Sequence, residues 1–419
     1  MIDQGNGTRF RVNGVVLGDG ERFALLIDSK TGLPEPWATR YSAVFLRSKA
    51  GSVNTMSKAL RSIALSEEWA ELRGIDLTQR LESGDLLTQE ETVDFVNWLR
   101  LARASSVGQS EASQPPAVVA PDTHYTRVLD ARAYFSWRAE IAIHRISIAS
   151  GRYGDAAQKL ENWSRMIGGL VRGAPSRTKY GLAPDLRKRF LEVIDPESPE
   201  NPFAPANRYR NFALLLTYYE LGLRRAEALV LKAGDLHLAG HRPNVYVYRR
   251  PDDPDDPRPD EPLVKTASRV LFVGAKLRGV LETWVIKHRS DRVRYPGAKK
   301  TPFVFVSDNG RPMALRTVYD LFVTIREMFP EFPRDFSPHT LRHDWNDRFS
   351  DLCDDERTAE SERGVPADER LTHAKEMAMR NYLMGWKKHS QRAATYTNRT
   401  TEARSAELIL RLQERSVHG

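Results

Sequence analysis

The stretch SPHTLRHDWNDR spans residues 337–348 and reads as the first turns of a helix. It places His339, Arg342 and His343 on one face, because residues three and four apart are neighbours on a helix surface. A serine in the N-cap position and Pro338 after it are typical of a helix start. Free backbone N–H groups at such a start favour anions, and a guanidinium group between two imidazoles can donate to phosphate oxygens. The stretch therefore predicts a phosphate-binding helix start.

Composition limits the classes of protein that this chain can be. Its 419 residues allow two or three domains, and the 41% of apolar residues can form real cores. A formal net charge of +8 favours a polyanionic partner such as DNA. The single cysteine, Cys353, excludes an intramolecular disulfide and a cysteine-based metal cluster. Because neither a long apolar run nor a signal-peptide pattern is present, we expect a soluble cytoplasmic protein with no membrane partner.

The N-terminal part of the chain predicts a small β element followed by helices. Residues 1–50 contain short alternating runs separated by Asn-Gly and Gly-Asp-Gly turn signals, and one interpretation is an arm that reads separate DNA sites. Residues 51–168 have helical periodicity, including a capping box at Thr88 and Glu91. Within them, residues 103–122 are expected to form a flexible connection. We expect a helical domain here, and the sequence leaves open whether it is a plain packing module or also contacts DNA.

A basic segment, residues 169–200, joins this region to the second half of the chain. It mixes Gly and Pro with many Lys and Arg residues, which predicts an interdomain linker that lies on a phosphate backbone. The candidate DNA-binding side chains are Arg177, Lys179, Arg187, Lys188 and Arg189.

The second half, residues 201–419, mixes helices with a few short strands. Two acidic segments, 251–262 and 351–370, are weakly apolar and are expected to be solvated surface excursions. An amphipathic tail helix is expected at 402–415, with Leu408, Ile409 and Leu412 on one face. The whole chain is therefore predicted to be mainly α-helical with a small β-sheet.

Four sequence segments together resemble the tyrosine recombinase (phage integrase) family: GLRRAEALVLKAGDL, VKTASRVLFV, SPHTLRH and LMGWKKHSQRAATYTN. The resemblance covers about residues 170–415 and implies an α-helical core-binding domain followed by a mixed α+β catalytic domain. The catalytic residues that it implies are Arg224, Lys265, His339, Arg342, Trp386 and Tyr396, with Glu227 and His343 as supporting residues.

The resemblance also implies a reaction that needs neither metal nor cofactor. Tyr396 would attack phosphorus and form a covalent 3′-phosphotyrosyl link. Arginine residues and Trp386 would donate to the phosphate oxygens, since guanidinium groups suit that geometry. Lys265, on a mobile hairpin, would protonate the leaving oxygen, and His339 would be the base or proton-transfer partner.

The function implied by the resemblance is site-specific DNA recombination. The expected partners are duplex DNA and further copies of the chain, as a dimer to tetramer that assembles on DNA through the C-terminal helix. The expected location is the nucleoid, in a bacterial or mobile-element context. Two alternatives remain: a type IB topoisomerase-like enzyme that relaxes DNA, and an architectural DNA-binding factor that keeps the fold but not the chemistry.

The individual residues also have competing interpretations. Arg224 and Glu227 alone could form an ordinary surface ion pair. Tyr382 is the rival nucleophile, although its helical context favours a core position. The remaining alternatives are Lys232 or Lys276 in place of Lys265, and His389 in place of Trp386.

The spacing of His339 and His343 also occurs in zinc-binding helices. However, that motif needs a glutamate where this sequence has Thr340, and Arg342 would repel a cation. We therefore expect no metal site.

Overall fold

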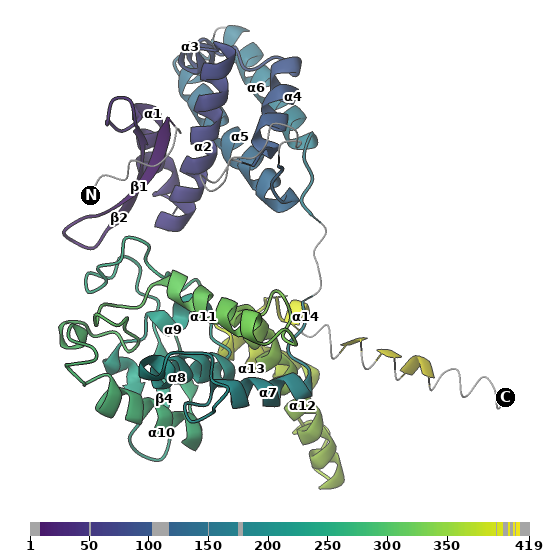
Figure 1. The fold of residues 1–419 in the computed structure, drawn as a ribbon. Coiled ribbons are helices and arrows are strands. Elements are labelled where there is room, and N and C mark those ends of the chain that lie inside the picture. Colours follow the sequence, from purple (N-terminus) through teal and green to yellow (C-terminus); the bar gives the residue numbers. More distant parts are fainter. Residues whose placement is uncertain are drawn as a thin grey trace, which may run out of the picture. The chain divides into compact units, whose positions relative to one another are not determined.

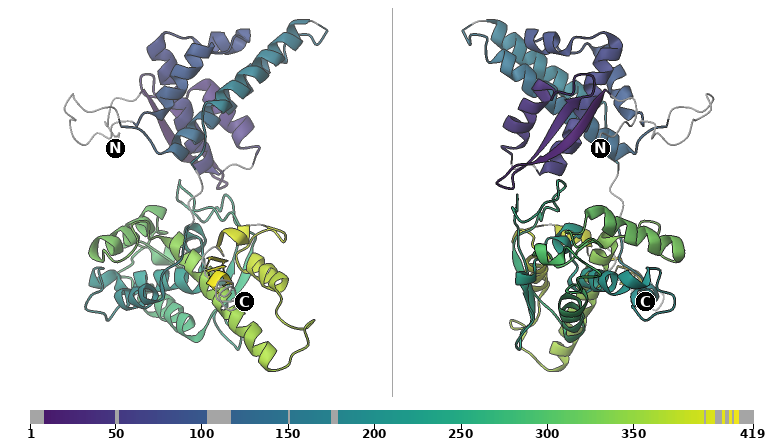
Figure 2. Two further views of the ribbon diagram at one scale, coloured as in Figure 1. Left: turned by 90° about the vertical axis from the view of Figure 1, so that its right-hand side faces the viewer. Right: turned by 60° about the vertical axis from the view of Figure 1, so that its left-hand side comes forward.

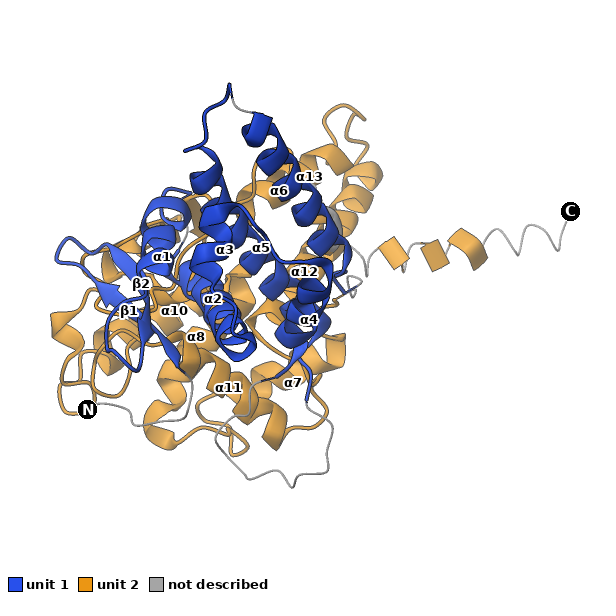
Figure 3. Ribbon diagram, turned by 90° about the horizontal axis from the view of Figure 1, so that it is seen from above, with its two compact units in different colours: residues 1–176 blue, residues 177–419 orange. Residues whose placement is uncertain are grey.

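The computed structural model describes residues 9–49, 52–102, 117–149, 151–174, 179–390, 392–396 and parts of 401–410. The chain divides into two compact units, residues 1–176 and 177–419 (Figures 1 and 3). Each unit has its own hydrophobic core. Among the helices that the structure describes, none is both long and apolar enough to cross a membrane.

The first unit combines a β-hairpin with a set of helices (Figure 2). Its strands pair antiparallel, and Ala24 and Leu26 of the hairpin lie in the same buried cluster as Leu60 and Ile63 of the first long helix. The N-terminal β element is thus part of the core of this unit. The elements are β1 (Phe10–Val16), β2 (Arg22–Asp28), α1 (Pro36–Arg40), the π-helical η1 (Tyr41–Leu46), α2 (Val53–Arg73), α3 (Leu77–Ser83), α4 (Gln89–Arg100), α5 (Pro121–Ile143) and α6 (Gly151–Gly169).

Local sequence signals set the ends of these helices. The predicted capping box is confirmed, since the Thr88 hydroxyl accepts from Glu91 N and the Glu91 carboxylate accepts from Thr88 N. Helix α2 ends at Gly74, whose φ of 66° lies in the left-handed region that favours glycine. Most of the expected connection at 103–122 lies outside the described residues, and α5 already begins at Pro121.

The second unit is built around α8, most of whose side chains are buried. Helices α7, α10 and α12 contact it, and a three-stranded antiparallel sheet has the order β3-β4-β5. Because the described residues form only two small sheets, the predicted fold class, mainly α with a small β component, is confirmed. The elements are α7 (Pro184–Ile194), α8 (Pro205–Leu221), α9 (Arg225–Leu229), η2 (Ala233–Asp235), β3 (Leu236–His237), β4 (Asn244–Val247), β5 (Arg269–Phe272), α10 (Ala275–Thr283), η3 (Trp284–His288), η4 (Ala298–Lys300), α11 (Leu315–Met328), α12 (Pro338–Glu362), α13 (His373–Leu383) and α14 (Arg392–Tyr396).

The structure differs from the linker expected at residues 169–200. Residues Pro184–Ile194 form helix α7, and its side chains Phe190, Val193 and Ile194 are fully buried in the core of the second unit. Spacings of three and four residues put these apolar side chains on one face, so the segment folds as an amphipathic helix despite its basic composition.

The acidic segment 251–262 is not a solvated excursion, which corrects the expectation. Asp256 is 2% exposed, and Arg258 pairs with it at 2.6 Å while also donating to Met313 O at 2.6 Å. Lys232 Nζ lies 2.7 Å from the Asp253 carboxylate. The segment can be buried because cations from inside and outside it neutralise its carboxylates.

The second acidic segment, 351–370, likewise departs from a surface loop. Helix α12 continues to Glu362, and Cys353 on its inner side is 3% exposed. Arg357 pairs at 2.9 Å with Glu376 of α13, which holds this extension against the neighbouring helix. The side chains of Asp351, Asp355, Glu356 and Glu362 on this extension are exposed.

Candidate functional site

The predicted helix start at residues 337–348 is present, and its Arg342 is fully buried. Pro338 opens α12, and the backbone N–H of Ser337 donates to the Thr340 hydroxyl at 3.1 Å. Arg342 is 0% exposed and donates from Nη1 to Gly222 O at 2.7 Å and from Nη2 to Met384 O at 3.0 Å. Burial lowers the pKa of Arg342 to about 10, although the nearby Glu227 carboxylate opposes the shift. The guanidinium group is therefore fixed in place and still charged near neutral pH.

Glu227 is the anion around which the buried cations gather. Its carboxylate lies 2.9 Å from Arg269 Nη2, 3.7 Å from Arg342 Nη1 and 3.4 Å from Arg224 Nη1. Thr266 donates its hydroxyl to the same carboxylate at 2.6 Å. Burial alone would raise the pKa of Glu227, but Arg269 and Arg342 overcome that effect and lower it to about 2. One carboxylate thus orients three guanidinium groups.

Two histidines and Tyr396 form a second layer of the site. His343 Nε2 and His339 Nε2 are 3.2 Å apart, within hydrogen-bond distance. The ring of Tyr396, on α14, stacks on His343 with centroids 4.3 Å apart and meets His339 edge-on at 5.8 Å. Desolvation, and then neighbouring cations including Lys179, lower the pKa of His339 to about 4. Desolvation also lowers the pKa of His343 to about 3, so both imidazoles are neutral near pH 7.

Trp386 brings an unused donor to the same place. Its ring lies 5.0 Å from that of Tyr396 and 5.5 Å from the guanidinium carbon of Arg342. Within the described part of the chain, the buried indole N–H of Trp386 and the Nε of Arg342 have no hydrogen-bond partner. Buried donors without partners cost free energy, so these two N–H groups fit an acceptor supplied by a ligand.

The remaining predicted catalytic residues lie at the edge of this cluster. Arg224 and His339 line a cavity of about 330 Å³ together with Arg342. Lys265 is exposed, and its chain neighbour Thr266 bonds to Glu227. The structure therefore gathers the arginines, histidines, tryptophan and tyrosine, and leaves Lys265 at the rim with its side chain in solvent.

The competing residues lie elsewhere. Tyr382 is 56% exposed, so the expected core position is wrong; its side chain projects from α13 into solvent. His389 is also exposed. Lys232 already pairs with two aspartates, and Lys276 is exposed on α10.

The five candidate DNA-binding residues have different surroundings. Arg177 lies outside the described residues. Lys179 lines a cavity of about 220 Å³ with His339 and His343. Arg187 is bonded to Asp344 at 2.6 Å, whereas Lys188 keeps an 83% exposed side chain.

The fifth candidate, Arg189, pairs with Glu200 at 2.7 Å and with Glu331 at 3.2 Å. Arg187 and Arg189 are therefore cations that carboxylates already satisfy, and only Lys179 adjoins the cluster.

Sequence reasoning missed two members of the cluster, Thr266 and Arg269. Both are buried and both contact Glu227, Thr266 from just before β5 and Arg269 from the first position of β5. A weak local signal exists, because Arg269 begins the strand RVLF and shares a strand face with Leu271, which is buried. Its partner, however, is 42 positions away in the sequence, and no local pattern identifies that partner.

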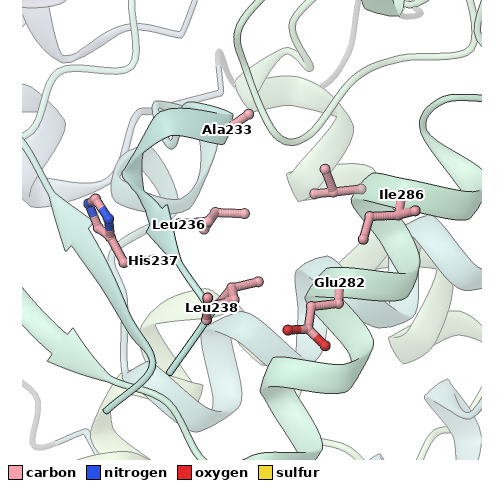
Figure 4. Close-up of a pocket in the computed structure, with 8 residues that line it drawn as sticks. Ala233, Leu236, His237, Leu238, Glu282 and Ile286 are labelled. Atoms are coloured by element: carbon pink, nitrogen blue, oxygen red, sulfur yellow. The ribbon is translucent and has the colours of Figure 1, made fainter. Parts of the chain in front are cut away.

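Another groove of the second unit is separate from this cluster. Its volume is about 510 Å³, and Figure 4 shows Leu236 and Leu238 facing Glu282 and Ile286 across it. Glu282 already pairs with Arg278 at 2.9 Å. The lining contains none of the predicted catalytic residues.

Comparison with known proteins gives the following similarities. Residues 193–351 match the sequence model of the phage integrase family. Among solved structures, the chain is similar to the XerH site-specific recombinase bound to difH substrate, with 17% identity, a TM-score of 0.47 and coverage of 88% of this chain and 84% of that one. The XerA recombinase has 15% identity, a TM-score of 0.33 and coverage of 86% and 92%.

The Tn1549 transposon integrase in complex with transposon right end DNA has 16% identity, a TM-score of 0.40 and coverage of 68% and 80%. No curated protein sequence matches the chain significantly. The matched segment contains Arg224, Glu227 and the whole helix start with His339 and Arg342. This segment of the second unit is therefore similar to the phage integrase family, the tyrosine recombinases.

Proposed function

We propose that the protein is a site-specific DNA recombinase that cleaves and rejoins duplex DNA through a covalent 3′-phosphotyrosyl intermediate, without a metal ion. The observation that carries this proposal is the position of Tyr396, whose ring contacts His339, His343 and Trp386 beside the buried Arg342. A tyrosine used only for packing would not need two neutral imidazoles and an unused indole donor around it. The family match does not favour the topoisomerase-like or the non-catalytic alternative.

The proposed cleavage step balances with groups in this chain. The Tyr396 oxygen attacks phosphorus, and its proton passes to His339, which is neutral near pH 7 because its pKa is lowered to about 4. The bond from phosphorus to O5′ breaks, and the leaving O5′ takes a proton from the Lys265 ammonium group. The phosphotyrosyl link keeps the energy of the broken ester, so attack by a 5′-hydroxyl reverses the step and rejoins DNA.

Arginine and tryptophan donors would stabilise the charge that develops on the phosphate oxygens. Arg342 Nε and Trp386 Nε1 are buried beside Tyr396 without partners in the described chain, and Arg224 lines the adjoining cavity. Donors that are already oriented for a transition state contribute roughly 3–4 kcal/mol each when removal is measured. The two carbonyls that hold Arg342 keep its guanidinium group oriented before the DNA arrives.

Assembly on DNA would use the C-terminal segment. Leu408 and Ile409 are 64% and 53% exposed, which supports docking of this apolar face on a neighbouring protomer. Leu412, the third member of the predicted face, lies outside the described residues. We propose a dimer to tetramer on duplex DNA, at the nucleoid of a bacterium or on a mobile element. A chain truncated after residue 400 that assembles normally on paired sites would contradict this role.

Covalent trapping tests the chemistry. The Tyr396→Phe protein can select its binding site from a randomised duplex pool, because binding does not need the hydroxyl. A nicked suicide duplex built on the selected site should then form a covalent adduct with the wild-type protein and none with Tyr396→Phe. The matched control is Tyr382→Phe, which should form the adduct at the wild-type rate. Loss of the adduct in Tyr382→Phe, with retention in Tyr396→Phe, would reverse the assignment of the nucleophile.

A further inference from the structure

Three consecutive backbone carbonyls before Trp386 are each held by a different donor. In the turn of residues 383–385, the first carbonyl accepts from Arg269 Nε at 2.6 Å and the second from Arg342 Nη2 at 3.0 Å. The third accepts from the backbone N–H of Ala267 at 3.0 Å. Two of these donors come from the segment that directly follows Lys265. The turn that leads into Trp386 is therefore bound to the segment after Lys265 at its first and third carbonyls, and to α12 at its second.

Gly385 permits this close approach. Its φ is 65°, and a Cβ atom added there would lie 2.8 Å from Thr266 Cβ and 3.0 Å from Ala267 O. Side chains rarely adopt that conformation, and the space is already filled. The hairpin and the turn are thus in contact at the backbone level.

The same hairpin segment is also tied to the anion at the centre of the site. Arg269 Nη2 lies 2.9 Å from Glu227, and the Thr266 hydroxyl donates to Glu227 at 2.6 Å. Arg269 is 2% exposed, so both of its contacts are made away from water. A single guanidinium group therefore spans Glu227 on one side and the turn before Trp386 on the other, which a planar group with five donors does better than an ammonium group.

We propose that Arg269 is a positioning residue that fixes the hairpin carrying Lys265 against the turn carrying Trp386, so that the proton donor for O5′ keeps its place relative to the phosphate-binding donors. This inference rests on the proposed recombinase function. It replaces the expected mobile hairpin with one whose base is fixed, and only the side chain of Lys265 remains in solvent. Arg269 acts through Lys265 and does not touch the DNA.

Replacing the leaving O5′ by sulfur separates a positioning role of Arg269 from a merely structural one. With an ordinary phosphodiester, the leaving O5′ must be protonated, so a displaced Lys265 slows cleavage. When sulfur replaces the bridging O5′, the leaving thiolate is stable without a proton, and the position of Lys265 no longer matters. A general loss of folding would slow both substrates equally.

The test uses the full-length protein and two nicked suicide duplexes on the selected site, one with O5′ and one with S5′ at the scissile bond. Arg269→Lys keeps the charge beside Glu227 but cannot span both contacts. It should slow cleavage of the O5′ duplex by about 10- to 100-fold, the scale of a displaced general acid, and should cleave the S5′ duplex within about threefold of wild type. Equal slowing on both duplexes, or wild-type cleavage of the O5′ duplex, would overturn the proposal.

Two further variants complete the test. Arg210→Lys is the matched control, because Arg210 is also buried, at 5% exposed, and also donates to a carboxylate, that of Asp308, and to a backbone carbonyl, that of Val306. It should cleave both duplexes at the wild-type rate. Gly385→Ala displaces the turn that also carries Trp386, a donor to the phosphate oxygens, and should therefore slow cleavage of both duplexes. A wild-type protein that forms no adduct would refute the proposed function itself, whereas a normal adduct with an unselective Arg269→Lys refutes only this inference.

Discussion

Two arginine-rich regions of the second unit use their positive charge in different ways. Around Glu227, three guanidinium groups share one buried carboxylate. In the basic segment of residues 179–189, Arg187 bonds to Asp344, and Arg189 bonds to both Glu200 and Glu331. The first region keeps a surplus of positive charge beside an open cavity. The second neutralises its arginines and uses them to attach α7.

The difference shows that the number of cations in a segment does not measure its attraction for phosphate. A buried cation with too few anions is ready for a further negative group, while a cation with its own carboxylate must lose that partner first. The segment of residues 179–189 has many basic residues in sequence, yet we expect it to bind phosphate less well than the cluster around Glu227. The following predictions test this difference and the charges near the two regions, from the largest expected effect to the smallest.

The largest effect is expected from Arg342→Ala. This variant removes a fixed donor beside Tyr396 and should lower the rate of covalent adduct formation by about 10²- to 10³-fold. Affinity for the duplex should fall much less, because other basic residues remain. The measurement is single-turnover cleavage of the suicide duplex together with a binding titration. Arg187→Ala, from the neutralised region, serves as the control and should cleave within a few-fold of wild type. Equal losses in the two variants would contradict the contrast.

Glu227→Gln should produce the next largest effect, on stability. The substitution leaves three guanidinium groups around a neutral amide, and breaking a buried ion pair in this way costs about 3 kcal/mol. Urea unfolding followed by circular dichroism should show a lower midpoint with an unchanged slope. Glu200→Gln removes an exposed partner of Arg189 and should leave the midpoint nearly unchanged. A stable Glu227→Gln protein would mean that the arginines do not depend on this carboxylate.

How far the sequence predicted this arrangement depends on the distance between partners. The start of α12 and the capping box of Thr88 and Glu91 follow from residues within one helical turn, and both were predictable. The burial of segment 251–262 depends on contacts such as Arg258 with Met313, 55 positions apart, and no local pattern specifies them. Composition alone predicts that this segment is solvated, because it does not include the pairing of its aspartates with Arg258 and Lys232.

The candidate site shows the same limit. The family pattern identified most of the polar residues that the structure gathers, since each lies in a recognisable short motif. Arg269 has no such motif role, and two of its partners, Glu227 and Leu383, lie 42 and 114 positions away. Tyr382 illustrates the opposite error, because its helical periodicity is compatible with either face of α13, and the outer one is used.

A smaller effect is expected in the dependence of stability on pH. His339 and His343 have folded-state pKa values lowered to about 4 and about 3, against an ordinary value of 6.5. The unfolded chain therefore binds more protons below pH 6.5, so stability is complete above that pH and is lost as the pH falls toward 4. His343→Asn should flatten this loss in thermal melts measured across the window. The control, His237→Asn, changes an exposed histidine and should lose stability with falling pH as the wild type does. If the dependence of stability on pH were unchanged in His343→Asn, the linkage would be contradicted.

The smallest effect is expected in the dependence of DNA affinity on salt concentration. Lys179 lies beside the cluster, so its removal should release about one fewer counterion and reduce the slope of log affinity against log salt by about 1. Arg189→Ala should leave the slope unchanged, because Glu200 and Glu331 already neutralise that guanidinium group in the free protein. Titrations of Tyr396→Phe background proteins at several salt concentrations measure both slopes without cleavage. If Arg189→Ala lowered the slope as much as Lys179→Ala, the carboxylates must release Arg189 when DNA binds. The two arginine regions would then differ only in the free protein, and arginines of residues 179–189 would bind phosphate groups in the complex with DNA.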